Sequence, residues 1–286
     1  MKNFKLPMNR GFLSSQTIAD IFSDNNEVYD LICTSKDYLI DNFESDQLKS
    51  LSPIELNEYS YINMKYVKET ENNFKSNLMV QQLNIYFNKQ SVKEVIHKYR
   101  IGTSKTWDGA TIFWYIDIHG KVCSGETMKF DYLYNEPIGF DDKPFVDSMR
   151  AILYKQGLID DSFNQKNILF GEHLLKNSQK PIAIVESEKT AVIASLEYPD
   201  FTWLATGIDS QLTFDKFKVL EGFDVTLCPN NHNFKLWYKK AIEYGFKISL
   251  LTKHELSWKG NPKTDLSDWI LKRIQMDEYY FGENQD

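Results

Sequence analysis

The sequence predicts an α/β protein: a C-terminal parallel sheet with helices on both faces, preceded by a smaller α+β part. From Pro181 onward, short apolar runs alternate with amphipathic segments, as in parallel strands that are connected by helices. Upstream, residues 110–130 contain two strand-like runs around His119 and Gly120, which predicts a β-hairpin. The chain has 286 residues, enough for one large domain or two of ordinary size.

The part before the hairpin is expected to be mostly helical. Residues 1–60 are rich in Ser, Asn and Asp and contain short amphipathic pieces, which indicates helices and loops. Residues 76–99 carry apolar side chains at helical spacing, with a break near Asn88. Ser91 and Glu94 have the spacing of a capping box, so we expect the second helix to begin there.

After the hairpin, residues 131–150 are expected to form an irregular connection, and residues 167–175 an apolar stretch that leads into a short helix. The rest of the chain alternates strands with helices. Thr213 is the expected N-cap of the second of these helices and Gly222 its end, while Gly245 ends the third. The expected strands are 182–185, 202–207, 224–229 and 246–251, and the expected helices are 188–196, 213–222, 233–245 and 266–275.

Several residues of this part fall at one edge of the predicted sheet. Glu186 and Asn230 follow strands, Gly207 ends one, and Asp265 precedes the last helix. Ligands of parallel sheets collect at the carboxyl ends of the strands. A carboxylate at the end of a buried strand is costly unless something pairs with it. Glu186 is therefore expected either to begin a helix or to face a cation or a phosphate-bearing ligand.

Composition indicates a globular chain with a sizeable core, because 42% of the residues are hydrophobic and 26% are charged. No apolar run approaches the roughly 20 residues of a membrane-spanning helix, and the first residues lack the pattern of a secretory signal. The three cysteines lie far apart, which predicts neither a disulfide framework nor a zinc site and favours the cytoplasm. A net charge of −7 argues against indiscriminate nucleic-acid binding but leaves room for a local basic groove.

The order of the motifs resembles the Toprim fold shared by bacterial replicative primases, topoisomerases and related nucleases. The likeness covers roughly residues 60–275 and is nearest to primase-like Toprim proteins of mobile elements and phages. It implies an N-terminal segment 1–60, a primase-like α+β part 61–164 and a Toprim-like domain 165–286. The motifs, in chain order, are YRIGTSKTWDGATIFWYIDIHGKVCSGETMKFD, NILFGEHLL, IVESEKTAVIAS, WLATGIDSQLTFDKFKVLEGFDVTLCPN and TDLSDWIL.

The resemblance implies phosphoryl-transfer chemistry at the strand ends, with Glu186 as general acid or base and Mg²⁺ held by acids that follow later strands. This sequence departs from that pattern, because Asn230 and His232 stand where aspartates are expected and Ser267 replaces another acid. The sequence has no cysteine cluster of the kind that forms the zinc-binding module preceding many primase cores, so we expect no such module here. Since fewer carboxylates remain, we expect weak Mg²⁺ binding. The remaining candidate metal ligands are Asp265, Asp268, Glu188 and Asn230.

Basic residues around the hairpin are candidates for contact with a nucleic-acid backbone. An even number of residues separates Lys121 from Lys129, so on one regular strand both would face the same side. Aromatic residues of the hairpin could stack bases, but in a strand they are more often core. The candidate nucleic-acid contacts are Arg100, Lys105, Lys121, Lys129 and Lys189, and the aromatic candidates are Trp107, Trp114 and Tyr115.

The sequence therefore predicts a primase-like protein of a mobile element or phage that binds single-stranded DNA or a primer–template and has weakened Mg²⁺-dependent nucleotidyl transfer. Replication or host-defence proteins are further candidate partners, and no membrane is expected. The alternatives are a Mg²⁺-dependent nuclease and a non-catalytic DNA- or protein-binding module. Each kind of site residue also has a structural explanation. Acids are favoured in the first turn of a helix, and Asp265 fits an N-cap. The lysines would then belong to an ordinary solvent-exposed face.

Overall fold

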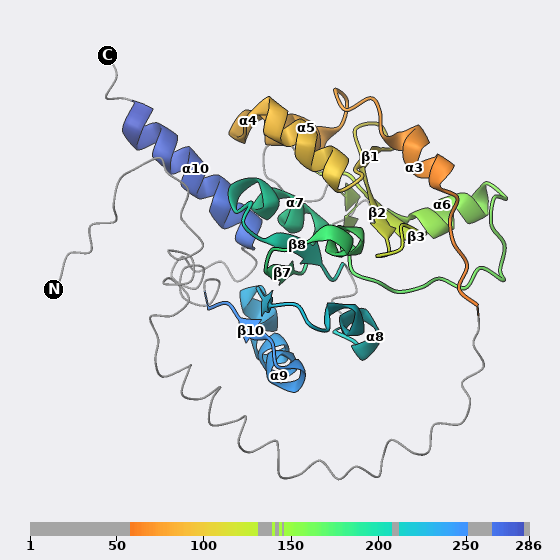
Figure 1. Ribbon diagram of the computed structural model, residues 1–286. Helices are drawn as coiled ribbons and strands as arrows, with labels where there is room; N and C mark the ends of the chain where they lie inside the picture. The colour runs from red at the N-terminus through yellow and green to blue at the C-terminus, as the bar shows by residue number, and fades with distance from the viewer. Residues whose placement is uncertain are drawn as a thin grey trace, which may run out of the picture. The chain divides into compact units, whose positions relative to one another are not determined.

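The structure is a computed structural model that describes residues 58–130, 139–140, 143–144, 146–207, 212–250 and 265–282 (Figure 1). The helices and loops expected in residues 1–57 and the first part of the connection expected at 131–150 lie outside the described residues. Among the described helices, none combines the length and the apolar character that a membrane span requires.

The first sheet is antiparallel and is built around the predicted hairpin. Its strands are ordered β1 (Gly102–Thr103), β2 (Thr111–Ile116), β3 (Val122–Met128) and β6 (Val146–Ser148). β2 and β3 pair antiparallel along their length, which confirms the hairpin.

The hairpin turn is fixed by one side chain and one glycine. Asp117 Oδ1 accepts hydrogen bonds from the backbone N of His119 at 3.0 Å and of Lys121 at 2.9 Å. Gly120 has a φ of +80°, a conformation that favours glycine. The turn therefore lies where the sequence predicts it.

The irregular connection expected at 131–150 is partly wrong, because its described end is regular. β4 (Gly139–Phe140) pairs with β5 (Lys143–Pro144), and β6 joins the first sheet next to β3. Helix α6 (Met149–Lys155) then begins at Ser148, whose Oγ accepts a hydrogen bond from the backbone N of Ala151 at 3.1 Å.

In the described residues before the hairpin, three helices flank it: α3 (Met64–Thr70), α4 (Leu78–Tyr86) and α5 (Lys89–Lys98). The break near Asn88 is confirmed, but the capping box at Ser91 and Glu94 is wrong. Asn88 itself caps α5, since its Oδ1 accepts from the backbone N of Gln90 at 2.8 Å. Ser91 lies inside the helix, and Glu94 accepts a side-chain hydrogen bond from Gln90.

The second sheet is parallel, with the strand order β10 (Lys247–Ile248), β9 (Val225–Leu227), β7 (Ile182–Val185) and β8 (Thr202–Ala205). Its helices are α7 (Glu188–Glu197), α8 (Phe214–Phe217), α9 (Phe234–Tyr244) and α10 (Leu266–Gly282). The predicted helix 213–222 is split, because the 3₁₀ turn η3 (Lys218–Leu220) follows α8. The predicted strand 246–251 is shortened to β10.

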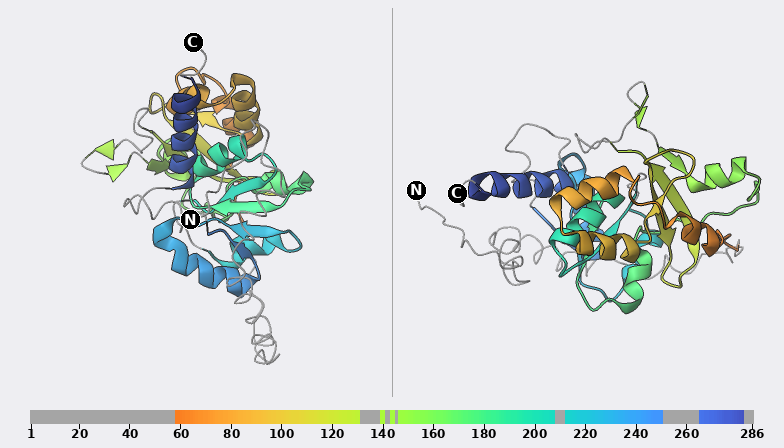
Figure 2. Two further views of the ribbon diagram at one scale, coloured as in Figure 1. Left: turned by 90° about the vertical axis from the view of Figure 1, so that its left-hand side faces the viewer. Right: turned by 90° about the horizontal axis from the view of Figure 1, so that it is seen from above.

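Both faces of the parallel sheet are covered, which confirms the α/β fold class. Alternate residues of β7 belong to different cores: Ile182 and Ile184 pack with side chains of α8 and α9, whereas Ala183 and Val185 pack with α7 and α10. The blue helix α10 lies beside α7 and α4 (Figure 2). The sheet is thus buried on both sides, as its continuous apolar strands predict.

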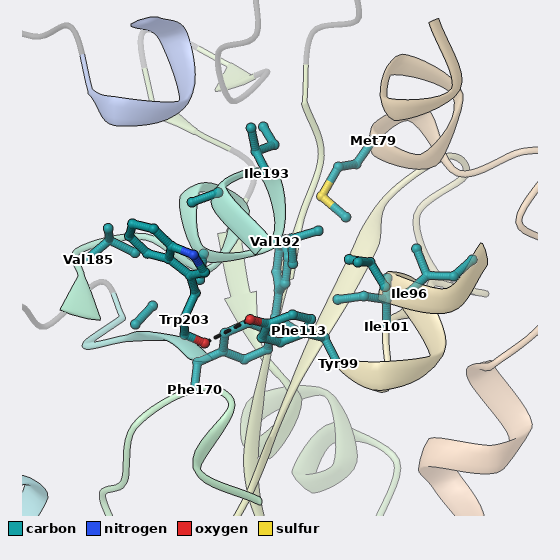
Figure 3. Packing of buried hydrophobic residues seen from close by; sticks show 14 of the residues in the cluster. Met79, Ile96, Tyr99, Ile101, Phe113, Phe170, Val185, Val192, Ile193 and Trp203 are labelled. Carbon is teal, nitrogen blue, oxygen red and sulfur yellow. Dashed lines mark hydrogen bonds between the residues drawn. The ribbon is translucent and has the colours of Figure 1, made fainter. Parts of the chain in front are cut away.

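The core on the α7 side continues into the inner face of the hairpin, and Phe170 lies at this junction (Figure 3). Phe170 precedes the short 3₁₀ helix η2 (Glu172–Asn177). Its backbone exchanges two hydrogen bonds with Ala205, of 2.8 and 3.1 Å. Its ring stacks on Tyr99 at 5.4 Å and packs edge-on against Phe113 at 5.7 Å. One residue therefore extends the edge of β8 and fills the core beneath the hairpin.

We expect Phe170→Ala to lower the free energy of unfolding by about 3–5 kcal/mol, because it leaves a cavity where the two parts meet. Phe214→Ala is the matched control, since Phe214 is 67% exposed, and should cost less than about 0.5 kcal/mol. Urea titration followed by tryptophan fluorescence measures both values. Equal losses in the two variants would contradict the role assigned to Phe170.

Candidate functional site

Glu186 follows β7 at the carboxyl edge of the parallel sheet, where it holds the chain that follows β9. Its Oε1 accepts a hydrogen bond from the backbone N of Asn230 at 2.8 Å, and its Oε2 accepts one from Asn233 Nδ2 at 2.8 Å. His232 Nε2 lies 3.8 Å from Oε2. The structure thus brings Glu186 and Asn230 together as predicted, but through the backbone of Asn230. The carboxylate is engaged by protein donors on both oxygens.

Asp265 caps the last helix. Its Oδ1 accepts from the backbone N of Asp268 at 2.9 Å, and Asp268 Oδ2 accepts from the backbone N of Asp265 at 3.2 Å, a reciprocal capping box. Its Oδ2 accepts from Thr190 Oγ1 at 2.8 Å, which joins the start of α10 to the first turn of α7. Burial would raise the pKa of Asp265, but the Lys189 ammonium and these hydrogen bonds together hold it below its usual value. Asp265 is therefore an ionised structural residue.

Glu188 points away from these acids and into the interface with the hairpin. Its side chain is fully buried, and its Oε1 accepts a hydrogen bond from the Tyr115 hydroxyl. Its Oε2 has no hydrogen-bond partner among the described residues. Burial raises the pKa of this carboxyl, although the Tyr115 hydrogen bond and the Lys216 ammonium act in the opposite direction. Glu188 is therefore remote in function from Glu186, two residues before it.

The donor set does not fit a magnesium site. Mg²⁺ requires several oxygen ligands in near-octahedral geometry. Glu186 and Asp265 are engaged by protein hydrogen bonds, and Glu188 faces a different part of the molecule. Within the described ranges, no group of three or more His, Cys, Asp and Glu side chains is arranged to hold a metal ion. The ligands suggested by the resemblance (Asp265, Asp268, Glu188 and Asn230) are not assembled around one point there.

Two of the predicted nucleic-acid contacts are tied up within the protein. Arg100 Nε lies 2.6 Å from Glu71 Oε1 and its Nη2 donates to Glu71 Oε2 at 2.9 Å. Lys189 is buried, with its Nζ 5.7 Å from the centre of the Phe130 ring and its charge beside Asp265. Both residues therefore have structural partners in place of a phosphate.

The other three lysines border the hairpin, but not as one regular row. Lys105 and Lys121 are exposed and Lys129 is half-buried. Tyr115 pairs with Ser124 whereas Ile116 pairs with Val122, so Cys123 is an extra residue that bulges from β3. Because the bulge breaks the alternation of side chains, an even spacing does not place Lys121 and Lys129 on one face. The premise of a regular strand is therefore wrong.

Aromatic side chains are divided between the core and the surface. Trp114 is fully buried and donates from Nε1 to Thr70 Oγ1 at 3.0 Å, and Tyr115 is buried against Phe170. Tyr59 and Tyr61 are exposed, with 45% and 43% of their surface accessible. Sequence reasoning missed this pair, although the alternation in Tyr59-Ser60-Tyr61 is a signal that could have found it.

Tyr59 and Tyr61 lie on a segment that is held against the connection before η2. Ser60 N donates to Asn164 O at 2.8 Å, Asn164 N donates to Ser60 Oγ at 3.1 Å, and Ser60 forms a bridge with Gln165. The Lys121 ammonium lies 5.9 Å from the centre of the Tyr61 ring. We name Tyr59, Tyr61 and Lys121 the tyrosine platform.

A polar cavity of about 200 Å³ lies between the hairpin and the end of β8. Sequence reasoning also missed Lys216, which is 2% exposed and donates from Nζ to Thr206 O at 2.9 Å. Gly207 has a φ of +82°, and a Cβ there would come within 2.2 Å of the Tyr115 hydroxyl. The cavity is lined by Tyr115, Ser124, Glu126, Gln165, Lys166, Asn167, Ile168, Thr206, Gly207 and Lys216.

Comparison with known proteins gives one family and a set of distant structures. The model of the family described as "Domain of unknown function (DUF6371)" matches residues 72–231. No curated protein matches the chain.

Among solved structures, the DnaG primase catalytic domain bound to ssDNA is 13% identical, covers 73% of this chain and 74% of its own, and has a TM-score of 0.46. The primase fragment of the bacteriophage T7 primase-helicase protein is 14% identical, covers 82% of both chains and has a TM-score of 0.43. The E. coli primase catalytic core is 13% identical, covers 77% of this chain and 82% of its own, and has a TM-score of 0.45. Similarity this low transfers no residue's role.

The buried carboxyl of Glu188 predicts a pH-dependent stability. Because burial raises its pKa in the folded state, the contribution to stability is fully present below the unfolded pKa of about 4.3. It is lost as the pH rises through the folded pKa. Glu188→Gln keeps an acceptor for Tyr115 but cannot ionise. We therefore expect the stability of the wild type relative to this variant to fall as the pH rises above about 4.

Urea unfolding of both proteins across this range measures the difference, with Glu69→Gln, at an exposed position on α3, as the matched control. A difference between wild type and Glu188→Gln that stays constant with pH would contradict the assignment of a raised pKa to this carboxyl.

Proposed function

The chain belongs to the family described as a domain of unknown function (DUF6371), and we propose that it is a primase-like protein that binds single-stranded DNA. The observation that carries this proposal is the tyrosine platform, in which Tyr59 and Tyr61 are exposed and the Lys121 ammonium lies 5.9 Å from the centre of the Tyr61 ring. The order of sequence motifs that resembles the Toprim primases adds a context, the replication or mobilisation of a phage or another mobile element.

The platform has the two features that a single strand requires. Tyr59 and Tyr61 are two residues apart on a segment bridged through Ser60, so they share a side about 7 Å apart along the chain. Successive bases of an unpaired strand stack on aromatic rings in this way, while lysine neutralises the backbone. Trp114 and Tyr115 are buried and cannot stack bases, whereas Tyr59 and Tyr61 are exposed.

The charge of the platform suits a local contact rather than a long basic groove. Lys121 is exposed at the hairpin turn, and its backbone N donates to Asp117. The side chain of Asp117 also pairs with Lys166 at 3.3 Å, so the two lysines lie near each other. With a net charge of −7 over the chain, binding rests on these few cations and on stacking. The salt dependence should therefore correspond to the neutralisation of only a few phosphates.

Binding is favoured over metal-dependent catalysis, because Glu186 and Asp265 are engaged in structural hydrogen bonds. Glu186 holds Asn230 and Asn233, and Asp265 holds the first turns of two helices. Nucleotidyl transfer and nuclease activity that depend on Mg²⁺ both require a set of metal ligands, and no such set is arranged among the described residues. The proposed function therefore depends on the exposed tyrosine platform, and the acids at the carboxyl edge of the sheet stabilise the fold.

Two substitutions separate stacking from charge. We expect Tyr61→Ala to weaken binding of a fluorescent single-stranded oligonucleotide roughly 5- to 100-fold, because one base no longer stacks, with little change in the salt slope. Lys121→Glu should also weaken binding but should flatten the plot of log K against log salt by about 0.7 for each phosphate that the variant no longer neutralises. Fluorescence anisotropy at several salt concentrations measures both effects.

Lys239→Glu is the matched control for the charge change, because Lys239 is exposed on α9, and it should leave the affinity nearly unchanged. Unchanged affinity in both platform variants, with the wild type binding DNA, would show that the strand binds elsewhere.

Catalysis is tested separately by incubating the purified chain with Mg²⁺ or Mn²⁺, labelled nucleotides and a single-stranded template. Because the described acids form no metal site, we expect neither primer synthesis nor shortening of the template. Primer synthesis would indicate a nucleotidyl transferase, and shortened strands would indicate a nuclease. If either activity appears and Glu186→Gln abolishes it, the binding-only proposal is wrong.

A further inference from the structure

We propose that the polar cavity beside the tyrosine platform takes up one unpaired nucleobase of the bound strand. This inference rests on the proposed function and adds to it a site that reads the identity of a base. The cavity has walls from the hairpin, from residues 165–168, from the end of β8 and from α8, so elements on several sides fix its shape.

The cavity adjoins the segment that carries the platform. Gln165, a lining residue, bridges to Ser60 between the two exposed tyrosines. Lys166, another lining residue, pairs with Asp117, whose other oxygen accepts from the backbone of Lys121. A strand that stacks on the platform therefore passes the exposed side of the cavity, where Gln165 and Asn167 meet solvent.

The size of the cavity suits one base. Pockets for drug-sized ligands measure roughly 300–1,000 Å³, whereas this one measures about 200 Å³. A base fits such a space only if its sugar and phosphate remain outside. Lys166, whose side chain is 24% exposed, lies at the wall where it can contact that phosphate.

The chemistry of the lining suits the edge of a base, which presents donors and acceptors side by side. Glu126 supplies a carboxylate that accepts from an exocyclic amino group. Asn167 and Gln165 supply amides that both donate and accept, and Ser124 adds a hydroxyl. Ile168 and Tyr115 provide apolar surface for the ring.

The back wall is preorganised by the buried contact between the hairpin and α7. Gly207 lacks the Cβ that would otherwise come within 2.2 Å of the Tyr115 hydroxyl. The hydroxyl therefore reaches Glu188, and this hydrogen bond holds Tyr115 at the cavity wall. Lys216, another lining residue, is held by its hydrogen bond to Thr206 O. A pocket formed before binding discriminates among bases at a smaller entropic cost.

The test uses oligodeoxynucleotides of about six nucleotides, within the site sizes of single-strand binders, each with one abasic position. For the wild type we expect an abasic site at one position to weaken binding most, because that base occupies the cavity. Asn167→Leu and Glu126→Gln should reduce this position-specific penalty to within about twofold while leaving the salt slope unchanged. Glu69→Gln, at an exposed carboxylate outside the cavity lining, is the matched control for Glu126→Gln.

A second readout does not depend on affinity. 2-Aminopurine placed at the sensitive position should become protected from acrylamide quenching in the wild type and lose this protection in Asn167→Leu, whose exposed position tolerates substitution. Thermal unfolding checks that each variant folds. Equal abasic penalties at every position, or an unchanged penalty in both cavity variants, overturns the base pocket while leaving strand binding intact. If none of the oligonucleotides binds, strand binding and the base pocket both fail.

Discussion

The described fold depends on one residue that contacts both sheets, through its backbone and through its side chain. Phe170 exchanges backbone hydrogen bonds with Ala205 at the edge of β8, while its ring packs against Tyr99, Phe113 and Tyr115. Tyr99 closes the same junction from the end of α5, since its hydroxyl donates to Trp203 O at 2.8 Å. Because backbone pairing and core packing meet here, the inner face of the hairpin is fixed over the end of β8. The cavity exists because of this placement.

Three acids that the sequence places near one edge of the parallel sheet have different environments and different roles. Glu186 accepts from amide donors, Asp265 caps a helix, and Glu188 is a buried carboxyl with a raised pKa. The difference follows from the direction of each side chain. Glu188 begins a helix and its side chain faces inward, whereas Glu186 stays at the end of the strand. The three acids therefore act at separate places in the fold instead of concentrating negative charge at one point.

The sequence was most informative where the local signals for strands and turns agree with the pattern of burial. The parallel strands and the hairpin follow from apolar runs and turn chemistry, and both were predictable. Ser91 failed as a cap because the helix begins one turn earlier, where Asn88 accepts hydrogen bonds from the backbone N of Gln90 and Ser91. Lys216 was hidden because a lysine near a helix start usually indicates a surface, and only tertiary packing buries it. The tyrosine platform escaped because an aromatic residue next to a strand is more often core.

The bulge at Cys123 restricts how this hairpin can diverge. Beyond it, Ser124 and Glu126 face the cavity, while Gly125 packs under Trp114 and Met149 on the opposite side. Loss of a single residue from β3 would exchange the two sides, pressing a carboxylate into the apolar layer and withdrawing the polar wall. Substitutions here can accumulate one at a time. Length changes in this stretch would be tolerated only in compensating pairs, so relatives that share this hairpin should keep its residue count.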